Sequence, residues 1–172
     1  GFVLMLEGDG EAGLRSSLAA LAIAERHDIA FIVPVLASQA GFLLAAQGQA
    51  ADGCAMARRA VRKAEELGIQ AGRSRWSARL SETCLRAGAT DDAVQYAETA
   101  VAVAEHGAEL GYLCSALRLR AKTRACGGDL DGARGDLQRA VAVARKLRLG
   151  PALAKCHFDT GALALCAARP AE

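Results

Sequence analysis

The chain has 172 residues, of which 52% are hydrophobic and only 4% aromatic, and its formal net charge is +2. This composition suffices for one continuous core built from Ala, Leu and Val. So small a net charge argues against a dedicated nucleic-acid binder, and the sequence contains no apolar run of about 18 residues that would predict a membrane span. Because it also lacks a signal peptide, we expect a cytoplasmic protein.

Small residues recur along the chain at a fixed interval of 40, as Gly8, Gly48, Gly88 and Gly128 and as Ala20, Ala60, Ala100 and Ala140. Such a period predicts stacked helical units whose apolar faces close only against their neighbours. We therefore expect a single all-α domain over residues 1–172, with units at 8–47, 48–87, 88–127 and 128–167. Arrays of this kind are usually binding surfaces rather than catalytic centres.

The first helix of each unit follows the recurring glycine. In the second unit its apolar residues are spaced by three and four, which places them on one face of a helix; they are Ala57, Ala60, Val61, Ala64 and Leu67. Alanines allow another helix to approach closely, so we expect Ala60, Ala100 and Ala140 at helix contacts. Acidic residues near each start favour an N-cap or a contact with the helix dipole; they are Asp9, Asp52, Asp91, Asp92 and Asp131.

The second helix of each unit precedes the next recurring glycine, and the four are expected at 33–47, 71–87, 109–127 and 151–167. Glycine suits the position after a helix end, because the left-handed conformation found there costs it nothing. Pro34 and Pro151 lie near the starts of two of these helices, where a missing amide donor is tolerated. For Pro34 a kink within the helix is the alternative.

The repeat register extends to both ends of the sequence. Residues 1–8 align on residues 41–48, and residues 169–172 resemble the turn into another first helix. We therefore expect a fragment of a longer array. Its ends would either self-associate or be covered by further helices, through apolar residues that comprise Phe2, Val3, Leu4, Leu6, Leu153, Leu163 and Leu165. The alternative is a monomer whose short terminal helices fold back to shield these residues.

The spacing of the small residues resembles the tetratricopeptide signature. It is seen in Gly41, Leu44, Gly48, Gly53, Ala57 and Ala60, and again in Ser81, Cys84, Gly88, Ala93, Ala97 and Ala100. The 40-residue period is longer than the usual 34 and is similar to extended arrays at the C-terminal end of large bacterial signalling ATPases. Residues 150–161 further resemble a pattern in the arrays of class III nucleotide cyclase and ATPase fusion proteins.

This resemblance implies a right-handed αα-superhelix whose second helices line a concave surface. The positions that correspond to groove residues are then basic, and they are Arg75, Arg86, Arg118, Lys122 and Lys155. Residues 58–86 carry eight basic and three acidic side chains, a local charge of 8 − 3 = +5. The alternative is an ordinary solvated surface. The groove lacks the asparagines of the family's carboxylate-clamp variant, so the resemblance assigns no peptide terminus as ligand.

Several apparent catalytic motifs are explained by the repeat. The stretch 8–13, GDGEAG, matches the dinucleotide-binding pattern, but Gly8 and Gly13 are repeat positions shared with Gly48 and Gly53. The six cysteines form no CxxC pair, and we expect reduced, buried thiols. Cys156 and His157 are adjacent on a helix and point about 100° apart, which disfavours mutual activation.

No ligand spacing predicts a metal site. His27 and His106 occupy near-equivalent helix ends, where a contact with the helix dipole is the expected role.

Two arginines break the repeat pattern. Arg120 and Arg124 stand where the neighbouring unit has Leu80 and Cys84, at positions expected to pack between helices. Buried unpaired guanidinium groups would be costly. We expect their ends to reach water, the alternative being neutralisation by acids such as Glu98 or Asp136.

The sequence thus predicts a noncatalytic scaffold or regulatory segment of a bacterial signalling protein. It would bind a protein, a peptide or another domain of its parent chain and would need no cofactor, metal, nucleic acid or membrane. The alternatives are a small-ligand sensor region in an ATPase-coupled transcription regulator and, more remotely, a dinucleotide-dependent enzyme.

Overall fold

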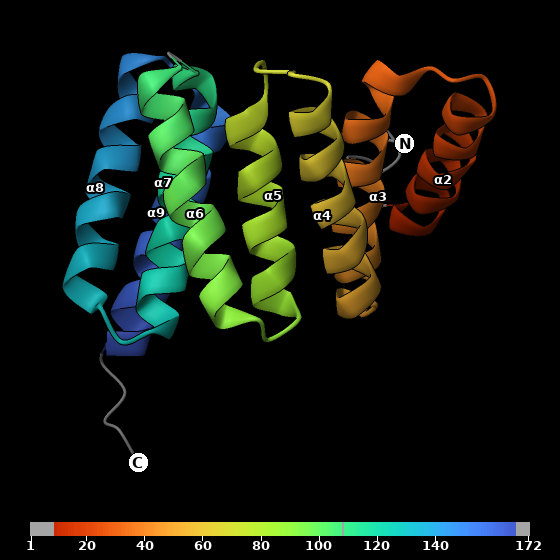
Figure 1. Ribbon diagram of the computed structural model, residues 1–172. Coiled ribbons are helices and arrows are strands. Elements are labelled where there is room, and N and C mark those ends of the chain that lie inside the picture. The colour runs from red at the N-terminus through yellow and green to blue at the C-terminus, as the bar shows by residue number, and fades with distance from the viewer. Residues whose placement is uncertain (1–8, 108, 168–172) are drawn as a thin grey trace.

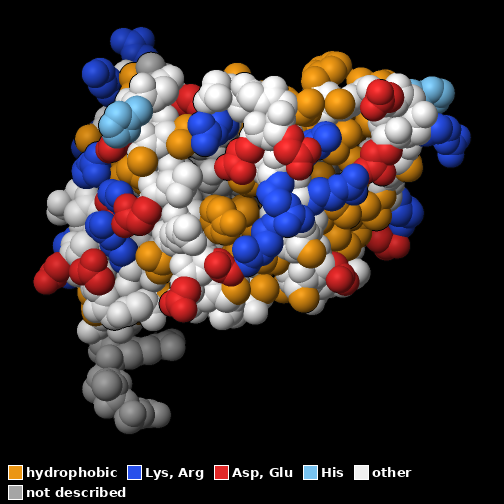
Figure 2. All heavy atoms as spheres, viewed as in Figure 1, with side chains coloured by type: hydrophobic (Ala, Val, Ile, Leu, Met, Phe, Trp, Pro, Cys, Tyr) orange, Lys and Arg blue, Asp and Glu red, His pale blue; other side chains and the backbone are white. Residues whose placement is uncertain are grey.

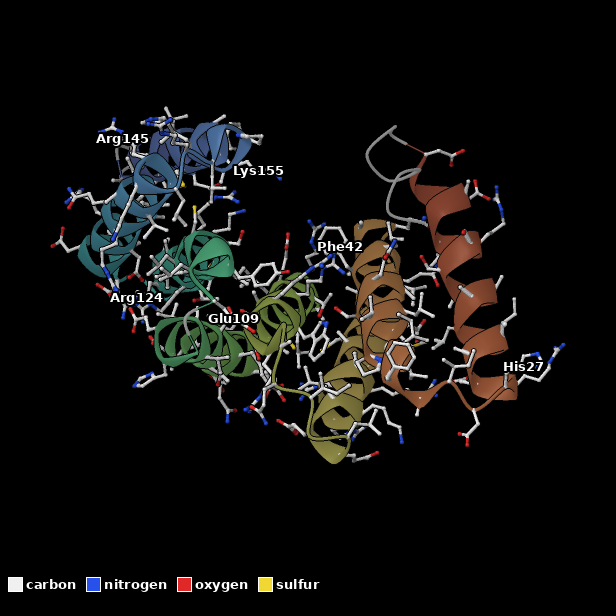
Figure 3. All side chains as sticks on the ribbon, turned by 90° about the horizontal axis from the view of Figure 1, so that it is seen from above. His27, Phe42, Glu109, Arg124, Arg145 and Lys155 are labelled. Carbon is white, nitrogen blue, oxygen red and sulfur yellow. The ribbon has the colours of Figure 1, made fainter. Side chains whose placement is uncertain are left out.

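The computed structural model describes residues 9–107 and 109–167. Expectations for Gly8, for a helical stub at 1–8 with its apolar Phe2, Val3, Leu4 and Leu6, and for a turn at 169–172 lie outside the described residues. Within the described part of the chain every regular element is helical. The helices run alternately up and down, side by side (Figure 1), and curve into an arc when seen from above (Figure 3). This is the predicted right-handed αα-superhelix.

The first helices of the units repeat at intervals of 40. They are α2 (Gly10–Arg26), α4 (Ala50–Glu66), α6 (Thr90–His106) and α8 (Leu130–Lys146), each 17 residues long. Asp9 accepts a hydrogen bond from the amide of Ala12 and caps α2 as expected. At the start of α8 the cap is Asp129, which accepts from the amide of Gly132 and was not singled out in the sequence. Asp131, which the sequence pattern singled out, lies in the first turn of α8.

The second helices lie close to their expected ranges. They are α3 (Val33–Ala46), preceded by a 3-10 turn η1 (Ala30–Ile32), then α5 (Arg73–Arg86), α7 (Leu110–Cys126) and α9 (Gly150–Ala167). Pro34 lies in the first turn of α3, which confirms that it begins the helix. The glycines that follow α3, α5 and α7 are left-handed as predicted, with φ of 87° at Gly48, 75° at Gly88 and 86° at Gly128.

Alanine is the most frequent residue among the buried apolar side chains. Ala60, Ala100 and Ala140 are fully buried, which confirms the expected register. The helices α3 and α4 approach closely, because a Cβ atom on Gly41 would lie 2.7 Å from the carbonyl oxygen of Gly53. A Cβ atom on Gly53 would lie 2.5 Å from the carbonyl oxygen of Gly41. The two backbones therefore touch, and only glycine fits at either position.

The Gly41–Gly53 crossing predicts a large effect for one added methyl group. Gly53→Ala should lower the free energy of unfolding by about 1–3 kcal/mol, because the methyl group meets backbone rather than a movable side chain. Gly135→Ala is the matched control, since a Cβ atom there meets nothing within 4 Å. It should raise stability by up to about 1 kcal/mol through helix propensity. Urea denaturation of both variants measures the difference, and equal effects would contradict the close crossing.

Candidate interaction groove

The concave side of the arc contains a groove of about 680 Å³ to which α3, α5, α7 and α9 all contribute. Figure 3 shows Phe42 and Lys155 on opposite sides of this concave surface. The side chains that line it are Phe42, Arg75, Arg79, Glu82, Tyr112, Ser115, Arg118, Leu119, Lys122, Lys155, Phe158 and Asp159. The groove is therefore basic and partly aromatic.

The structure brings together the side chains singled out in the sequence. Arg75, Arg118, Lys122 and Lys155 line the groove. Arg86 lies at its edge, with its guanidinium 5.8 Å from the centroid of the Phe42 ring. Their common location agrees with the tetratricopeptide geometry, whereas a role in binding stays a proposal.

Acidic neighbours compensate only part of the positive charge. The buried Asp159 accepts a hydrogen bond of 2.7 Å from Nε of Arg118 and lies 3.5 Å from Nζ of Lys122. Arg86 pairs with Glu82 at 3.2 Å. Within the part of the chain that the structure describes, no acid forms an ion pair with Arg75, Arg79 or Lys155.

Arg79 was not singled out as a groove residue in the sequence, although it lines the groove. Burial, followed by the positive charge of Arg75, lowers the pKa of Arg79 to about 10. Its guanidinium lies 5.7 Å from the Phe42 ring centroid, so an aromatic face partly replaces an acidic partner. The site is thus a local excess of positive charge in a recess where water screens it poorly.

The 40-residue period contains a signal for part of the missed lining. Arg75, Ser115 and Lys155 share one repeat position, and Arg79, Leu119 and Asp159 share another. Phe42, Glu82 and Lys122 share a third, and Arg118 and Phe158 a fourth. Shifting each predicted groove position by one period recovers Glu82, Ser115 and Phe158. It does not recover Arg79, because no predicted groove residue shares the repeat position of Arg79, Leu119 and Asp159.

The basic segment 58–86 is divided between two sides of the molecule. Arg58 and Arg59 lie on α4, and they form ion pairs with Asp92 of α6 and Glu25 of α2. Figure 2 shows the face that α4, α6 and α8 form, where basic and acidic side chains are interspersed. Of this segment only Arg75, Arg79 and Arg86 of α5 lie at the groove, so the local charge of the segment overstates its positive surface.

The surroundings of Arg120 and Arg124 differ from what the sequence led us to expect, because both side chains pair with acids. Arg120 is 9% exposed and donates hydrogen bonds of 2.8 and 2.6 Å to the two carboxylate oxygens of Asp136, and another of 2.8 Å to Glu98. Arg124 lies 3.1 Å from Asp136 and 3.3 Å from Glu98. The expectation that the end reaches water was wrong for Arg120, whereas the Arg124 side chain is 31% exposed. Neutralisation by these acids is confirmed for both arginines. The bidentate bond to Asp136 is the main cause of a raised pKa at Arg120.

Four of the six cysteines are buried as expected, whereas Cys126 and Cys166 are exposed near helix ends. Burial raises the pKa of Cys84 to about 12 and that of Cys114 to about 12, which removes their nucleophilic form near neutral pH. Cys156 is buried while His157 is exposed, in agreement with their divergent directions.

The described part of the dinucleotide-like stretch is helical, since Gly10–Gly13 lie in α2. Residues 30–36 belong to η1 and α3, so they do not form a strand of the kind that a dinucleotide-binding fold requires. His27 caps the C-terminal end of α2 and His106 is the last residue of α6, as expected.

Among the residues described, no group of three His, Cys, Asp or Glu side chains is placed to hold a metal ion. None of the described helices combines the length and apolar character needed to cross a bilayer.

Comparison with known proteins identifies the class of fold. No family model and no curated protein sequence matches the chain. Among solved structures, BtubC (BKLC) from P. vanneervenii is similar with a TM-score of 0.71 at 18% identity, over 90% of this chain and 65% of that one. The tetratricopeptide-like repeats of a putative kinesin light chain from Podosopora anserina are similar with a TM-score of 0.65 at 15% identity, over 95% of this chain and 84% of that one.

The chain therefore has a tetratricopeptide-like helical repeat fold. It spans 65% of the length of the BtubC chain that it matches. Neither similar protein is described as a nucleotide cyclase or an ATPase fusion, so that more specific resemblance stays a proposal.

Because charged side chains of α6, α7 and α8 pair with one another, the stability of the fold should depend strongly on keeping both partners of the buried pair. Arg120→Met should destabilise the fold by about 3–5 kcal/mol, because it removes the bidentate partner of the buried Asp136. The double variant Arg120→Met, Asp136→Leu should regain much of that loss, since no buried charge is stranded. Arg134→Ala removes an exposed pair with Asp131 and should change stability by less than about 0.5 kcal/mol. Chemical denaturation curves rank the three variants, and a small loss for Arg120→Met would contradict the buried network.

The thiols should divide into two kinetic classes. Ellman's reagent should react rapidly with Cys126 and Cys166 in the folded protein and slowly with the buried Cys54, Cys84, Cys114 and Cys156. A thiol with a pKa of about 12 is ionised to only about 10⁻⁴ at pH 8. Unfolding in guanidinium should release all six. A third rapidly reacting thiol in the native protein would contradict the burial, and fewer than six after unfolding would reveal a disulfide.

Proposed function

We propose that the chain is a noncatalytic interaction scaffold whose concave groove binds an acidic, extended segment of a protein. The single observation that carries this proposal is the uncompensated charge of Arg75, Arg79 and Lys155 at one surface of a tetratricopeptide-like array. The bound segment belongs either to a partner or to another domain of the parent protein. The parent is a bacterial cytoplasmic signalling protein, which the resemblance of residues 150–161 to cyclase-associated arrays supports.

Electrostatics favour an anionic ligand. Arg75 and Arg79 are one helical turn apart on α5, so their charges repel each other. A carboxylate placed between these two guanidinium groups would reduce this repulsion and replace lost hydration with charge-assisted hydrogen bonds. Arg118 and Lys122 already share Asp159 and contribute less net attraction.

Shape favours an extended ligand with apolar side chains. The groove crosses four helices rather than entering the space between two, so it contacts a ligand along its length. Tyr112 is 40% exposed and Phe158 is 77% exposed, and both line the groove. Exposed aromatic rings beside arginines are typical of protein interfaces, where they provide buried area at low entropic cost.

A labelled hexaglutamate peptide tests the charge preference directly, with hexaglutamine as the uncharged control. Fluorescence anisotropy should show saturable binding of hexaglutamate alone, weakened by added salt. Arg75→Glu and Lys155→Glu should each reduce affinity about tenfold, since each replaces attraction with repulsion. Failure of hexaglutamate to bind at millimolar concentration would overturn the proposed ligand class.

The control for net charge is Arg62→Glu, which makes the same change in charge on α4. Arg62 is exposed and lies in a separate recess with Arg59 and Lys63, so it does not contribute to the groove. This variant should retain most of the affinity of the unmodified protein. Losses equal to those of Arg75→Glu would show binding by overall charge, which contradicts a specific groove.

A further inference from the structure

A recess of about 280 Å³ lies on the outer side of the arc, between α4, α5 and α6. Figure 3 shows α4 and α6 on this outer side and α5 set back toward the concave surface. Trp76 and Ser77 of α5 line the recess and are only 7% and 4% exposed. Among the described residues no group forms a hydrogen bond with the Trp76 indole N–H or with the Ser77 hydroxyl. Because buried polar groups normally have partners, these two unpaired groups indicate room for a ligand.

Two charged side chains at the same recess also lack ionic partners. Glu65 of α4 and Arg73 of α5 both line it, and neither forms an ion pair within residues 9–107 and 109–167. The Arg73 guanidinium donates a 2.9 Å hydrogen bond to the side-chain oxygen of Gln70, which is uncharged. The recess therefore holds one uncompensated acid and one uncompensated base.

The free acid distinguishes the α4–α6 crossing from the equivalent crossings on either side. At the α2–α4 and α6–α8 crossings a glutamate of one helix pairs with an arginine of the next, and these pairs are Glu25–Arg59 and Glu105–Arg139. Glu65 has the repeat position of the two glutamates, but the position of the two arginines holds Thr99. An acid that is neutralised at both other crossings is thus left without a partner here.

The second helices show a matching difference. α3 and α7 place buried apolar side chains at this level, and these are Val33 and Ala37 in α3 and Leu113 and Leu117 in α7. The equivalent residues of α5 are Arg73 and Ser77. α5 therefore presents a base and a hydroxyl, beside the free acid, where its neighbours present apolar surface. A few convergent polar groups in a small recess are typical of a ligand site.

Other helices flank the recess on both sides, so its shape does not depend on the ends of the sequence. α2 and α3 precede it, and α7, α8 and α9 follow it. At the end of the described chain Leu165 of α9 is 69% exposed, whereas Leu163 packs against Leu137, which corrects the expectation that both present apolar surface.

We propose that the recess between α4, α5 and α6 binds a small α-amino acid with an apolar side chain. The ammonium group of the ligand pairs with Glu65 and its carboxylate pairs with Arg73, through charge-assisted hydrogen bonds. The Ser77 hydroxyl donates a further hydrogen bond to the carboxylate. A simple amine or a simple anion satisfies only one of the two free charges, so the site selects a zwitterion.

The walls and the size of the recess favour an apolar side chain on this ligand. Val61, Ala64 and Tyr96 line the recess together with the buried Trp76. Small-molecule sites span about 300–1,000 Å³, and this recess lies at the lower end of that range, which suits a molecule as small as an amino acid. The site is separate from the concave groove and does not rest on the proposed function.

Trp76 is the only tryptophan of the chain, so its fluorescence reports directly on the recess. Titration with L-leucine should change the Trp76 emission saturably, with half-saturation below about 10 mM. N-acetyl-L-leucine lacks the ammonium charge and L-leucinamide lacks the carboxylate, so each should bind about tenfold more weakly. The absence of a saturable change with L-leucine, or equal responses to the three compounds, would overturn the proposal.

Matched variants assign the two charges, with calorimetry as the readout. Glu65→Gln and Arg73→Gln should each weaken L-leucine binding about tenfold. Glu65→Gln should also remove the preference for L-leucine over N-acetyl-L-leucine, which a merely structural role of Glu65 would leave intact. Glu66→Gln is the control, because Glu66 lines a different recess and pairs with Lys63. Equal losses for Glu65→Gln and Glu66→Gln would contradict a specific contact.

Thr99→Arg tests the site without opening a cavity. The new guanidinium should pair with Glu65, as Arg59 pairs with Glu25 at the previous crossing. L-leucine binding should then be lost, while the melting temperature measured by circular dichroism should not fall. Full retention of binding by Thr99→Arg would overturn the proposed role of Glu65. Arg75→Gln alters only the concave groove and should bind L-leucine normally, so failure of that groove would not affect this result.

Discussion

Close packing of helix backbones at small residues is the constraint on which the rest of the structure depends. The chain has few aromatic residues with which to fill space, so stability must come from short distances between helices. Gly41 and Gly53 allow the backbones of α3 and α4 to touch, and fully buried alanines repeat the arrangement along the array. Because every unit packs in this way, the helices follow one curve, and their inner side becomes the groove.

The curve determines which charges meet. Asp159 of α9 reaches Arg118 and Lys122 of α7 because consecutive units turn their second helices toward a common concave side. By contrast, no acid of the described structure forms an ion pair with Arg75 or Arg79 of α5. The asymmetry between these two parts of the groove gives a repetitive scaffold a distinct site, since the backbone is nearly periodic but the side chains are not.

The sequence predicted the helices well because their boundaries depend on local signals that recur. Glycine in the left-handed conformation ends each of α3, α5 and α7, and the predicted ranges differ from the structure by at most two residues at either end. The groove was predicted in part, because the family pattern identified Arg75 but not Arg79. The pairing of Arg120 could not be predicted in the same way, since Glu98 and Asp136 are brought to it by two other helices.

The sizes of the residues at the crossings limit how such a chain can change length during evolution. Gly41 matches Gly53, whereas Ser81 faces Ala93 and its hydroxyl bonds to the opposing backbone. A recombination event that joined α3 directly to α6 would place Ala93 against Gly41, in a crossing shaped by a different pair of side chains. Length is therefore gained or lost most readily when both helices of a crossing are copied or deleted together.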